Sequence, residues 1–304
     1  MPELPDLTIY REHLARRIVG RRLLGIKVAH PFLLRSVEPN PRKLEGESVD
    51  AVSLVGKRIV VRLGELYLII HLMIAGRLLW HEEPRPVPKK RGLARFDFES
   101  GSLLLTEAGS RRRASLTLVK GVTQLAQIDP GGIDAIGATE AEFKSALTRE
   151  NHTVKRCLTD PRTFAGIGNA YSDEFLHRAG ISPFKQSARF DDSEVAALRL
   201  SCRDVLTEWI EPLRDESGEE FPRKVTAFRP EMAVHGKYQA PCPNCGTAIQ
   251  RIHYAENECN YCPGCQTDGK LLADRSLSRL LKNDWPRTVE ELEELRAVAP
   301  ESKS

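Results

Sequence analysis

Two patterns of apolar residues divide the chain into a strand-rich first half and a helical second half. Residues 1–19 carry apolar side chains at spacings of three and four, which predicts a helix. Short apolar runs then follow one another from residue 22 to 128 with no long helical pattern between them, and this favours an antiparallel sandwich or barrel. The cluster Asp-Pro-Gly-Gly at 129–132 ends this half and is the best candidate for a domain boundary.

The second half predicts several helices. Thr139 and Glu142 form a capping-box pattern at the start of one helix, and residues 191–210 carry an apolar face at helical spacing. Between them, residues 160–184 predict a glycine-rich turn that leads into another helix. Two short helical patterns, at 272–285 and 288–298, complete the chain, so the fold class is α+β.

Composition excludes several classes of protein. The 304 residues suggest two domains with a small appendage, and 41% hydrophobic and 29% charged residues exclude global disorder. The apolar stretch 66–80 is interrupted and shorter than the ~18–20 residues of a membrane helix. The first residues show no signal-peptide pattern, so we expect a cytoplasmic protein without a membrane partner. The net charge of +3 is small, but basic residues collect at 11–27, 57–62, 85–95 and 111–113, whereas acidic residues collect at 190–220 and 290–301.

Four of the seven cysteines form the strongest single motif. Two CxxC pairs separated by 16 residues have the spacing of a zinc ribbon; they are Cys242, Cys245, Cys262 and Cys265. One Zn²⁺ bound here would be structural, because the four cysteines fill all four of its tetrahedral coordination positions. The alternative is that one CxxC pair is a redox-active pair. Cys259 is a nearby thiol that could compete as a ligand, and Cys157 and Cys202 lie on apolar helix faces and are expected in the core.

The N-terminus offers a second candidate for chemistry. The small Pro2 permits removal of Met1, which would expose a secondary amine beside the carboxylate of Glu3. A chain-terminal amine titrates near pH ~8, so part of it is nucleophilic at neutral pH and can form a Schiff base while a carboxylate moves protons. Pro2 also suits a plain turn, and the N-terminus alone leaves both interpretations open.

Several motifs together resemble one family. MPELPD at the start, Gly56-Lys57 in a predicted strand, HLMIAGRL at 71–78, AGIGNAYSDEFLHRAGISP at 165–183 and the ribbon ending CPGCQ occur in this order. Over residues 1–266 the chain is similar to the bacterial formamidopyrimidine-DNA glycosylase and endonuclease VIII family of base-excision repair enzymes. The resemblance implies an N-terminal β-sandwich flanked by helices, a helix–two-turn–helix domain and a four-cysteine zinc finger, with DNA bound in the cleft between. We therefore predict domains at 1–130, 138–232 and 233–270, and a helical extension at 271–304.

The resemblance also implies a reaction. It implies a DNA glycosylase with AP lyase activity that excises damaged, oxidised bases through a Schiff base on Pro2, which attacks C1′. Glu3 would be the acid/base and Lys57 would contact phosphate and assist catalysis. Asn169 would bind the phosphate beside the lesion. Its place at a predicted helix start fits this role, because free backbone N–H groups there can bind an anion. Glu174 matches a family carboxylate in the same helix. The implied partner is double-stranded DNA with a damaged base or an abasic site, and the implied protein is a monomer at the bacterial nucleoid.

An enzyme that acts on a base inside a duplex must flip the nucleotide out and fill the gap. Ile74 lies where the family places a void-filling methionine, with Met73 beside it. The family's other two wedge residues, an arginine and a phenylalanine, lie in a loop that here contains Arg111, Arg112 and Arg113 and no phenylalanine. These arginines could fill the gap, bind phosphates, or form a solvated hairpin tip.

The finger departs from the family at one position. Asn257 stands where the family has an arginine that contacts the lesion phosphates, and the adjacent glutamates have the wrong sign for phosphate. Arg251 or Lys270 could substitute. This departure and the altered wedge loop motivate a second hypothesis, a non-catalytic damaged-DNA-binding protein of the same fold. The zinc ribbon by itself leaves a third hypothesis, an RNA-binding protein. Base choice is expected to depend on a pocket and on a flexible loop near 218–228.

Overall fold

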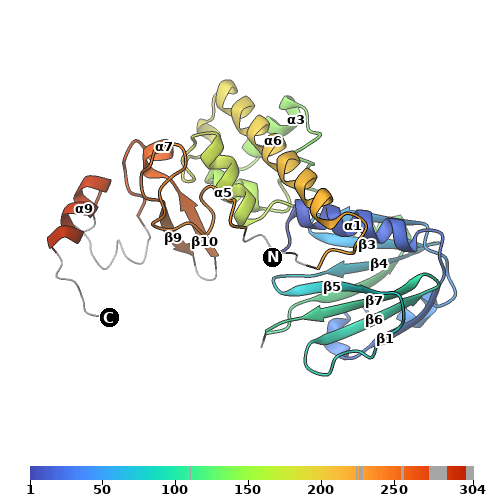
Figure 1. Cartoon of the computed structure of the whole chain (residues 1–304). Helices are drawn as coiled ribbons and strands as arrows, with labels where there is room; N and C mark the ends of the chain where they lie inside the picture. Colours follow the sequence, from blue (N-terminus) through green and yellow to red (C-terminus); the bar gives the residue numbers. More distant parts are fainter. Residues whose placement is uncertain (110, 224, 226–228, 255–256, 274–285, 299–304) are drawn as a thin grey trace. The chain divides into compact units, whose positions relative to one another are not determined.

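The computed structural model describes residues 1–109, 111–223, 225, 229–254, 257–273 and 286–298 (Figure 1). The chain forms two compact units. The first unit comprises residues 1–134, 164–167 and 206–227, and the second comprises 135–163, 168–205 and 228–304. The division into four domains expected from the sequence stays a prediction.

The first unit is a sandwich of two four-stranded antiparallel sheets, as the succession of short apolar runs predicts. One sheet has the order β1-β6-β7-β5, with bounds Leu23–Val28, Gly92–Phe98, Gly101–Glu107 and Gly76–His81. The other has the order β2-β3-β4-β8, with bounds Ala51–Val55, Arg58–Leu63, Leu66–His71 and Ser115–Lys120. Two short 3₁₀ turns, Pro31–Leu33 and Pro41–Leu44, lie between β1 and β2.

The second of these sheets is covered on both faces. On one face, Ile59, Val61 and Leu68 join the main core between the sheets. On the other, Val60 and Ile69 pack with partly buried apolar residues of α2 (Gly121–Ile128). Because both faces are covered, β3 and β4 consist of nearly continuous apolar runs instead of alternating ones.

Helix α1 (Leu4–Ile18) closes the core of the sandwich. Its side chains at Leu7, Tyr10, Leu14 and Ile18 are almost completely buried, which confirms the helical spacing of three and four. Burial of one such aliphatic side chain contributes roughly 1.5–3 kcal/mol. The helix that carries the N-terminus is therefore firmly attached to the sheets.

The second unit is helical, as predicted. It contains α3 (Glu140–Thr148), α4 (Val154–Thr159), α5 (Asn169–Arg178), a 3₁₀ turn at Ser187–Arg189 and the first part of α6 (Asp192–Ser217). The Thr139 capping box is confirmed, because its hydroxyl accepts the Glu142 N–H at 3.3 Å and the Glu142 carboxylate accepts the Thr139 N–H at 2.9 Å. Among the described helices, none is long and apolar enough to cross a membrane.

The cysteine motif folds as a small finger within the second unit. Its hairpin consists of β9 (Gln250–Tyr254) and β10 (Asn257–Tyr261), followed by α7 (Pro263–Thr267). The helix predicted at 288–298 is α9 (Val289–Val298), and its leading segment is tied to the finger by a hydrogen bond from the Leu271 N–H to the Arg287 carbonyl at 2.8 Å. Most of the helical pattern predicted at 272–285 lies outside the described residues.

Candidate functional site

The N-terminal segment is buried and held in place. Pro2 is buried and Glu3 is only 3% exposed; Glu3 caps α1 in a capping box with Asp6, whose carboxylate accepts the Glu3 N–H at 3.2 Å. The Leu4 N–H donates to the Gly166 carbonyl at 2.9 Å. Gly166 has φ +76°, and a Cβ there would lie 2.9 Å from the Leu4 Cβ, so this approach requires glycine. The first glycine of the AGIG motif therefore positions the N-terminus.

Charged side chains of both signs act on the terminal amine. Burial lowers the pKa of the Met1 amine below its ordinary value, and the charges of Arg77 and Lys57 act in the same direction, against Glu3 and Asp6. A lowered pKa leaves more of the amine unprotonated at neutral pH, which makes it a better nucleophile. The structure thus brings together the N-terminus, Glu3 and Lys57, and it adds Arg77, which was not predicted from the sequence.

Lys57 lies in a turn and not in a strand as expected. Gly56 and Lys57 form the two-residue connection between β2 and β3. The φ of Gly56 is +57°, a conformation that tight hairpin turns need and that glycine adopts without strain. The tip of this hairpin therefore presents the lysine close to the amine.

His71 is a second residue that the sequence analysis missed. It is the last residue of β4 and pairs with Arg58 of β3 in the sheet register. Burial lowers the pKa of His71 to about 4, and the charges of Arg58 and Lys57 add to the effect. Its imidazole is therefore neutral at pH 7, and it can accept a proton or a hydrogen bond beside Lys57.

Ile74 lies in the loop between β4 and β5. Its side chain is 52% exposed, and its carbonyl accepts Arg77 Nη1 at 3.3 Å. The Ala108 N–H donates to the Ala75 carbonyl at 3.5 Å, so the start of the arginine loop lies beside the Ile74 loop. The two segments that were predicted to act as a wedge are neighbours.

The arginine loop is not a hairpin tip. It connects β7 to β8, and these strands belong to different sheets, so the loop crosses between them. Glu107, 2% exposed, accepts the N–H groups of Arg113 (2.9 Å) and Ala114 (3.1 Å) and fixes the end of the loop. Arg112 donates to the Lys90 carbonyl at 2.6 Å, and Arg111 is exposed.

The segment after α6 is packed into the first unit. Phe221 and Val225 are 8% and 5% exposed and belong to the main core. The Phe221 ring lies 5.6 Å from the Tyr10 ring and 6.4 Å from the Trp80 ring, and the Arg17 guanidinium lies 5.6 Å above it. The loop that was expected to be flexible near 218–228 is thus anchored at these two described residues.

Asn169 and Glu174 lie on α5 in the second unit and face the finger. Asn169 is the first residue of α5, and its Nδ2 donates to the Glu258 carbonyl of β10. Glu174 is 7% exposed and accepts three backbone N–H groups, from Ala233 (2.8 Å), Val234 (3.0 Å) and His235 (2.9 Å). Glu174 therefore holds the segment that enters the finger.

The four predicted ligands lie together. The Sγ atoms of Cys242, Cys245, Cys262 and Cys265 lie within 4.8 Å of one another. Individual pairs are 3.4 Å and 3.8 Å apart, close to the edge of about 3.8 Å that a tetrahedron of thiolates 2.3 Å from Zn²⁺ would have. The residues thus fit a tetrahedral metal ion.

The surroundings of the cysteines also suit a metal. The pKa of Cys245 is lowered to about 6, chiefly by a hydrogen bond with Thr247. A lowered pKa favours the thiolate, which is the form of cysteine that binds a metal. His177 Nε2 lies 3.2 Å from Cys242 Sγ, where an N–H group stabilises a thiolate. Cys259 is buried on β10 and is not part of the group, and Cys157 and Cys202 are buried as expected.

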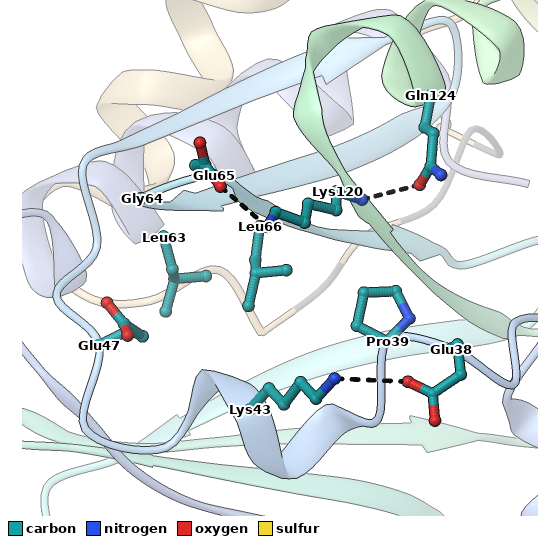
Figure 2. A pocket seen from close by; sticks show the side chains of 10 residues that line it. All are labelled: Glu38, Pro39, Lys43, Glu47, Leu63, Gly64, Glu65, Leu66, Lys120 and Gln124. Atoms are coloured by element: carbon teal, nitrogen blue, oxygen red, sulfur yellow. Dashed lines mark hydrogen bonds and ion pairs between the residues drawn. The ribbon is translucent and has the colours of Figure 1, made fainter.

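A pocket of about 680 Å³ lies elsewhere in the first unit and contains none of the predicted site residues (Figure 2). Its lysines are paired with carboxylates, Lys43 with Glu38 at 3.6 Å and Lys120 with Glu65 at 3.1 Å. Since opposite charges already neutralise each other there, the pocket is not the candidate site.

Comparison with known proteins decides the family. Residues 1–116 match the formamidopyrimidine-DNA glycosylase N-terminal domain and residues 134–219 match the formamidopyrimidine-DNA glycosylase H2TH domain. The formamidopyrimidine-DNA glycosylase of Acidothermus cellulolyticus is 31% identical over 282 residues, which is 88% of this chain and 97% of that protein. The chain belongs to the formamidopyrimidine-DNA glycosylase family. The Bacillus subtilis family member is 29% identical over 281 residues, 88% of this chain and 99% of that protein.

A shorter relative and two solved structures support this membership. An uncharacterized formamidopyrimidine-DNA glycosylase-like protein of Mycobacterium tuberculosis is 36% identical over 151 residues, half of this chain and 94% of that protein. MutM in complex with DNA containing carbocyclic 8-oxo-G has a TM-score of 0.77 at 26% identity, covering 88% of this chain and all of that chain. Lactococcus lactis Fpg bound to DNA with an AP site has a TM-score of 0.75 at 25% identity, covering 87% and 99%. The family resemblance and the fold expected from the sequence are confirmed.

Proposed function

We propose that this protein is a DNA glycosylase with AP lyase activity that removes damaged, oxidised bases from double-stranded DNA. The observation that carries the proposal is the buried N-terminus: burial lowers the pKa of the terminal amine, and the charges of Glu3, Arg77 and Lys57 act on it. Relatives named as formamidopyrimidine-DNA glycosylases, and solved relatives bound to 8-oxo-G or AP-site DNA, support the same substrate class.

In the proposed reaction, removal of Met1 exposes the secondary amine of Pro2. Its lone pair attacks C1′ of the damaged nucleotide, the C1′–N bond breaks, and the electron pair leaves with the base. Glu3 gives a proton to the deoxyribose ring oxygen, the ring opens, and loss of the Pro2 proton completes the iminium. Removal of a C2′ proton from this iminium would then expel the 3′ phosphate, which is the lyase step.

Several residues are proposed to contact DNA. Lys57, Asn169 and the arginines at 111–113 are proposed to bind phosphates, and Ile74 is proposed to fill the gap left by the flipped nucleotide. The exposed apolar side chain of Ile74, and the hydrogen bond from Ala108 to the adjacent Ala75, support this assignment. Glu174 is proposed to act through the finger, since its carboxylate already accepts three backbone N–H groups.

Arg251 is proposed, in preference to Lys270, as the phosphate-binding cation that replaces the family's arginine at the position of Asn257. Its guanidinium lies 4.5 Å above the Tyr238 ring and its Nη1 is 3.4 Å from a Glu258 carboxylate oxygen. The carbonyl of the same Glu258 accepts Asn169 Nδ2, so Arg251 and Asn169 meet at one residue. Lys270 instead lies where the backbone pairs with Thr288.

One structural Zn²⁺ is proposed at the four cysteines, where it would fix the finger without taking part in the chemistry. The ligands Cys242, Cys245, Cys262 and Cys265 would leave no coordination position for a water or a substrate, because all four corners of the tetrahedron are protein. Metal content per chain, measured by atomic absorption, tests this part of the proposal independently of activity.

Borohydride trapping tests the proposed reaction. The protein is incubated with duplexes that contain an oxidised purine, an oxidised pyrimidine or an abasic site, and the imine is reduced to a stable crosslink. We expect a crosslink that maps to Pro2 by peptide mass spectrometry. If no duplex of the panel is trapped by protein whose N-terminus is Pro2, the enzymatic proposal is wrong.

The non-catalytic alternative rests on Asn257 and on the acidic residues of the finger. It predicts tight binding of abasic-site duplex together with no trapping and an intact Met1 in the mature protein. An RNA-binding protein would instead prefer hairpin RNA over the same duplex at one salt concentration. The same preparations therefore separate the three hypotheses.

A further inference from the structure

Polar side chains of α5 attach the finger at helical intervals. Asn169, Asp173 and His177 are spaced by four residues and therefore lie on one face of the helix. Asn169 donates to the Glu258 carbonyl, Asp173 contacts Asn260, and His177 contacts a cysteine of the finger. This face of α5 is therefore the base on which the finger rests.

Asp173 is the hub of these contacts. Its side chain is completely buried and accepts hydrogen bonds from three different segments of the chain. One comes from Lys155 Nζ of α4, one from His235 Nδ1 at 2.7 Å, and two from Asn260, through its N–H at 3.1 Å and its Nδ2 at 3.2 Å. A single carboxylate thus joins α4, the segment leading into the finger, and strand β10.

The charge of this carboxylate is retained inside the protein. Burial acts to raise the pKa of Asp173, but the charge of Lys155 and the hydrogen bond from His235 outweigh it, and the pKa lies below its usual range. Lys155 Nζ also donates to the Asn169 carbonyl at 2.7 Å and to Ser172 Oγ at 2.8 Å. Asp173 therefore also fixes the lysine that holds the first turn of α5.

The two contacts between α5 and β10 have matching spacings. Asn169 and Asp173 are four residues apart on the helix, about 6 Å at a rise of ~1.5 Å per residue. Their partners, Glu258 and Asn260, are two residues apart on the strand, about 6.8 Å at a rise of ~3.4 Å. Because these lengths agree, helix and strand can hold both contacts at once, and a shift of β10 would break them together.

We propose that Asp173 is a positioning residue that keeps β10 of the finger aligned with the first turn of α5, so that Asn169 and the finger bind phosphate as one surface. The inference rests on the proposed function, because Asn169 is a phosphate ligand only there. Asp173 acts through Lys155 and Asn260 and is too deeply buried to touch DNA itself. It should therefore affect the grip on DNA and not the chemistry at Pro2.

The test compares Asp173→Asn with the exposed control Asp192→Asn. Asparagine keeps the size but removes the charge that Lys155, His235 and Asn260 share. We expect full metal content, faster hydrogen exchange of the amides at 257–261, and at least tenfold weaker binding of an abasic-site duplex at fixed salt. The rate of trapping at saturating duplex should stay within twofold of the wild type, and Asp192→Asn should match the wild type throughout.

Other outcomes overturn the proposal. Unchanged exchange and affinity in Asp173→Asn would show that the carboxylate does not align the strand, and a slower trapping rate at saturation would place its effect in the chemistry. If Asp173→Asn fails to fold, the Asn260→Ala variant replaces it, because it removes one contact to Asp173 and leaves the Asp173–Lys155 pair intact. We expect Asn260→Ala to bind the abasic-site duplex three- to tenfold more weakly. An unchanged affinity would refute the proposal. If the wild type traps no duplex, the proposed reaction fails, whereas exchange and affinity still report on the alignment.

Discussion

Replacement of Gly166 by alanine tests whether the AGIG motif positions the N-terminus. The new Cβ would lie 2.9 Å from Leu4 Cβ and 3.0 Å from Leu4 Cδ1, closer than side-chain carbons pack, while the backbone keeps a φ of +76°. Gly131 is a matched control, because it has φ +81° and a Cβ there would meet no atom within 4 Å. The two variants share the backbone strain and differ in the contact with Leu4.

The expected magnitudes follow from this difference. The left-handed conformation costs an alanine about 1–2 kcal/mol at either position. The overlap with Leu4 adds roughly 1–3 kcal/mol in Gly166→Ala, the usual cost of overpacking. At about 2–4 °C per kcal/mol for a unit of 150–250 residues, the Tm of Gly166→Ala should lie at least about 2 °C below that of Gly131→Ala.

The functional effect should exceed the loss of stability. Relief of the overlap moves Leu4 away from Gly166, and Pro2 and Glu3 move with it, so we expect borohydride trapping on abasic duplex to slow by more than about tenfold. Circular dichroism gives the Tm, and trapping is measured well below it. Equal Tm values and equal trapping rates in the two variants would refute the claim that Gly166 positions the N-terminus.

Three further variants probe the metal site, the finger and the core. Cys245→Ala should lose the bound zinc, whereas Cys259→Ala should retain it, as measured by atomic absorption; retention in the first would contradict the ligand set. Glu174→Gln should lower the free energy of unfolding in urea by about 1.5–3 kcal/mol, because a charged acceptor of three N–H groups is lost; an unchanged midpoint would argue against this anchor. Burial and two adjacent arginines lower the pKa of His13 to about 4, against ~6.5 when unfolded, so the unfolded chain binds more protons and stability falls as the pH drops from 6.5 to 4. His13→Gln should flatten this dependence of the Tm, and an equal slope in both proteins would show that other groups cause it.

The strands and long helices could be predicted because their signals are local. Helix α1 and the first part of α6 follow from apolar spacing, and the helix after Thr139 follows from a capping box. Three short helices were missed: α2 has eight residues and none of them is buried, α4 has six residues and α7 has five. Helices this short have too few turns to show a periodic pattern in the sequence. They form because tertiary contacts offset the nucleation cost of a short helix, and those contacts are not visible in the local sequence.

The site could be predicted only where chemistry leaves a motif. The cysteine pairs and the N-terminal Pro2-Glu3 carry their signal in adjacent residues, and the structure gathers the four thiols as expected. Arg77 acts on the Met1 amine across 76 positions of sequence, and Asp173 meets Asn260 across 87. Such pairs depend on the folded topology, and nothing in the local composition distinguishes either residue from a surface charge.

The burial of the chain's first residues has a practical consequence for recombinant work. Glu3 caps a helix and Leu4 is hydrogen-bonded to Gly166, so residues added before Pro2 would extend from a segment that is fixed in place. An affinity tag at this end would acylate the amine, and a single residue left after tag cleavage would have the same effect as the full tag. A tag belongs at the other end, after α9, and an inactive preparation should first be checked by its intact mass.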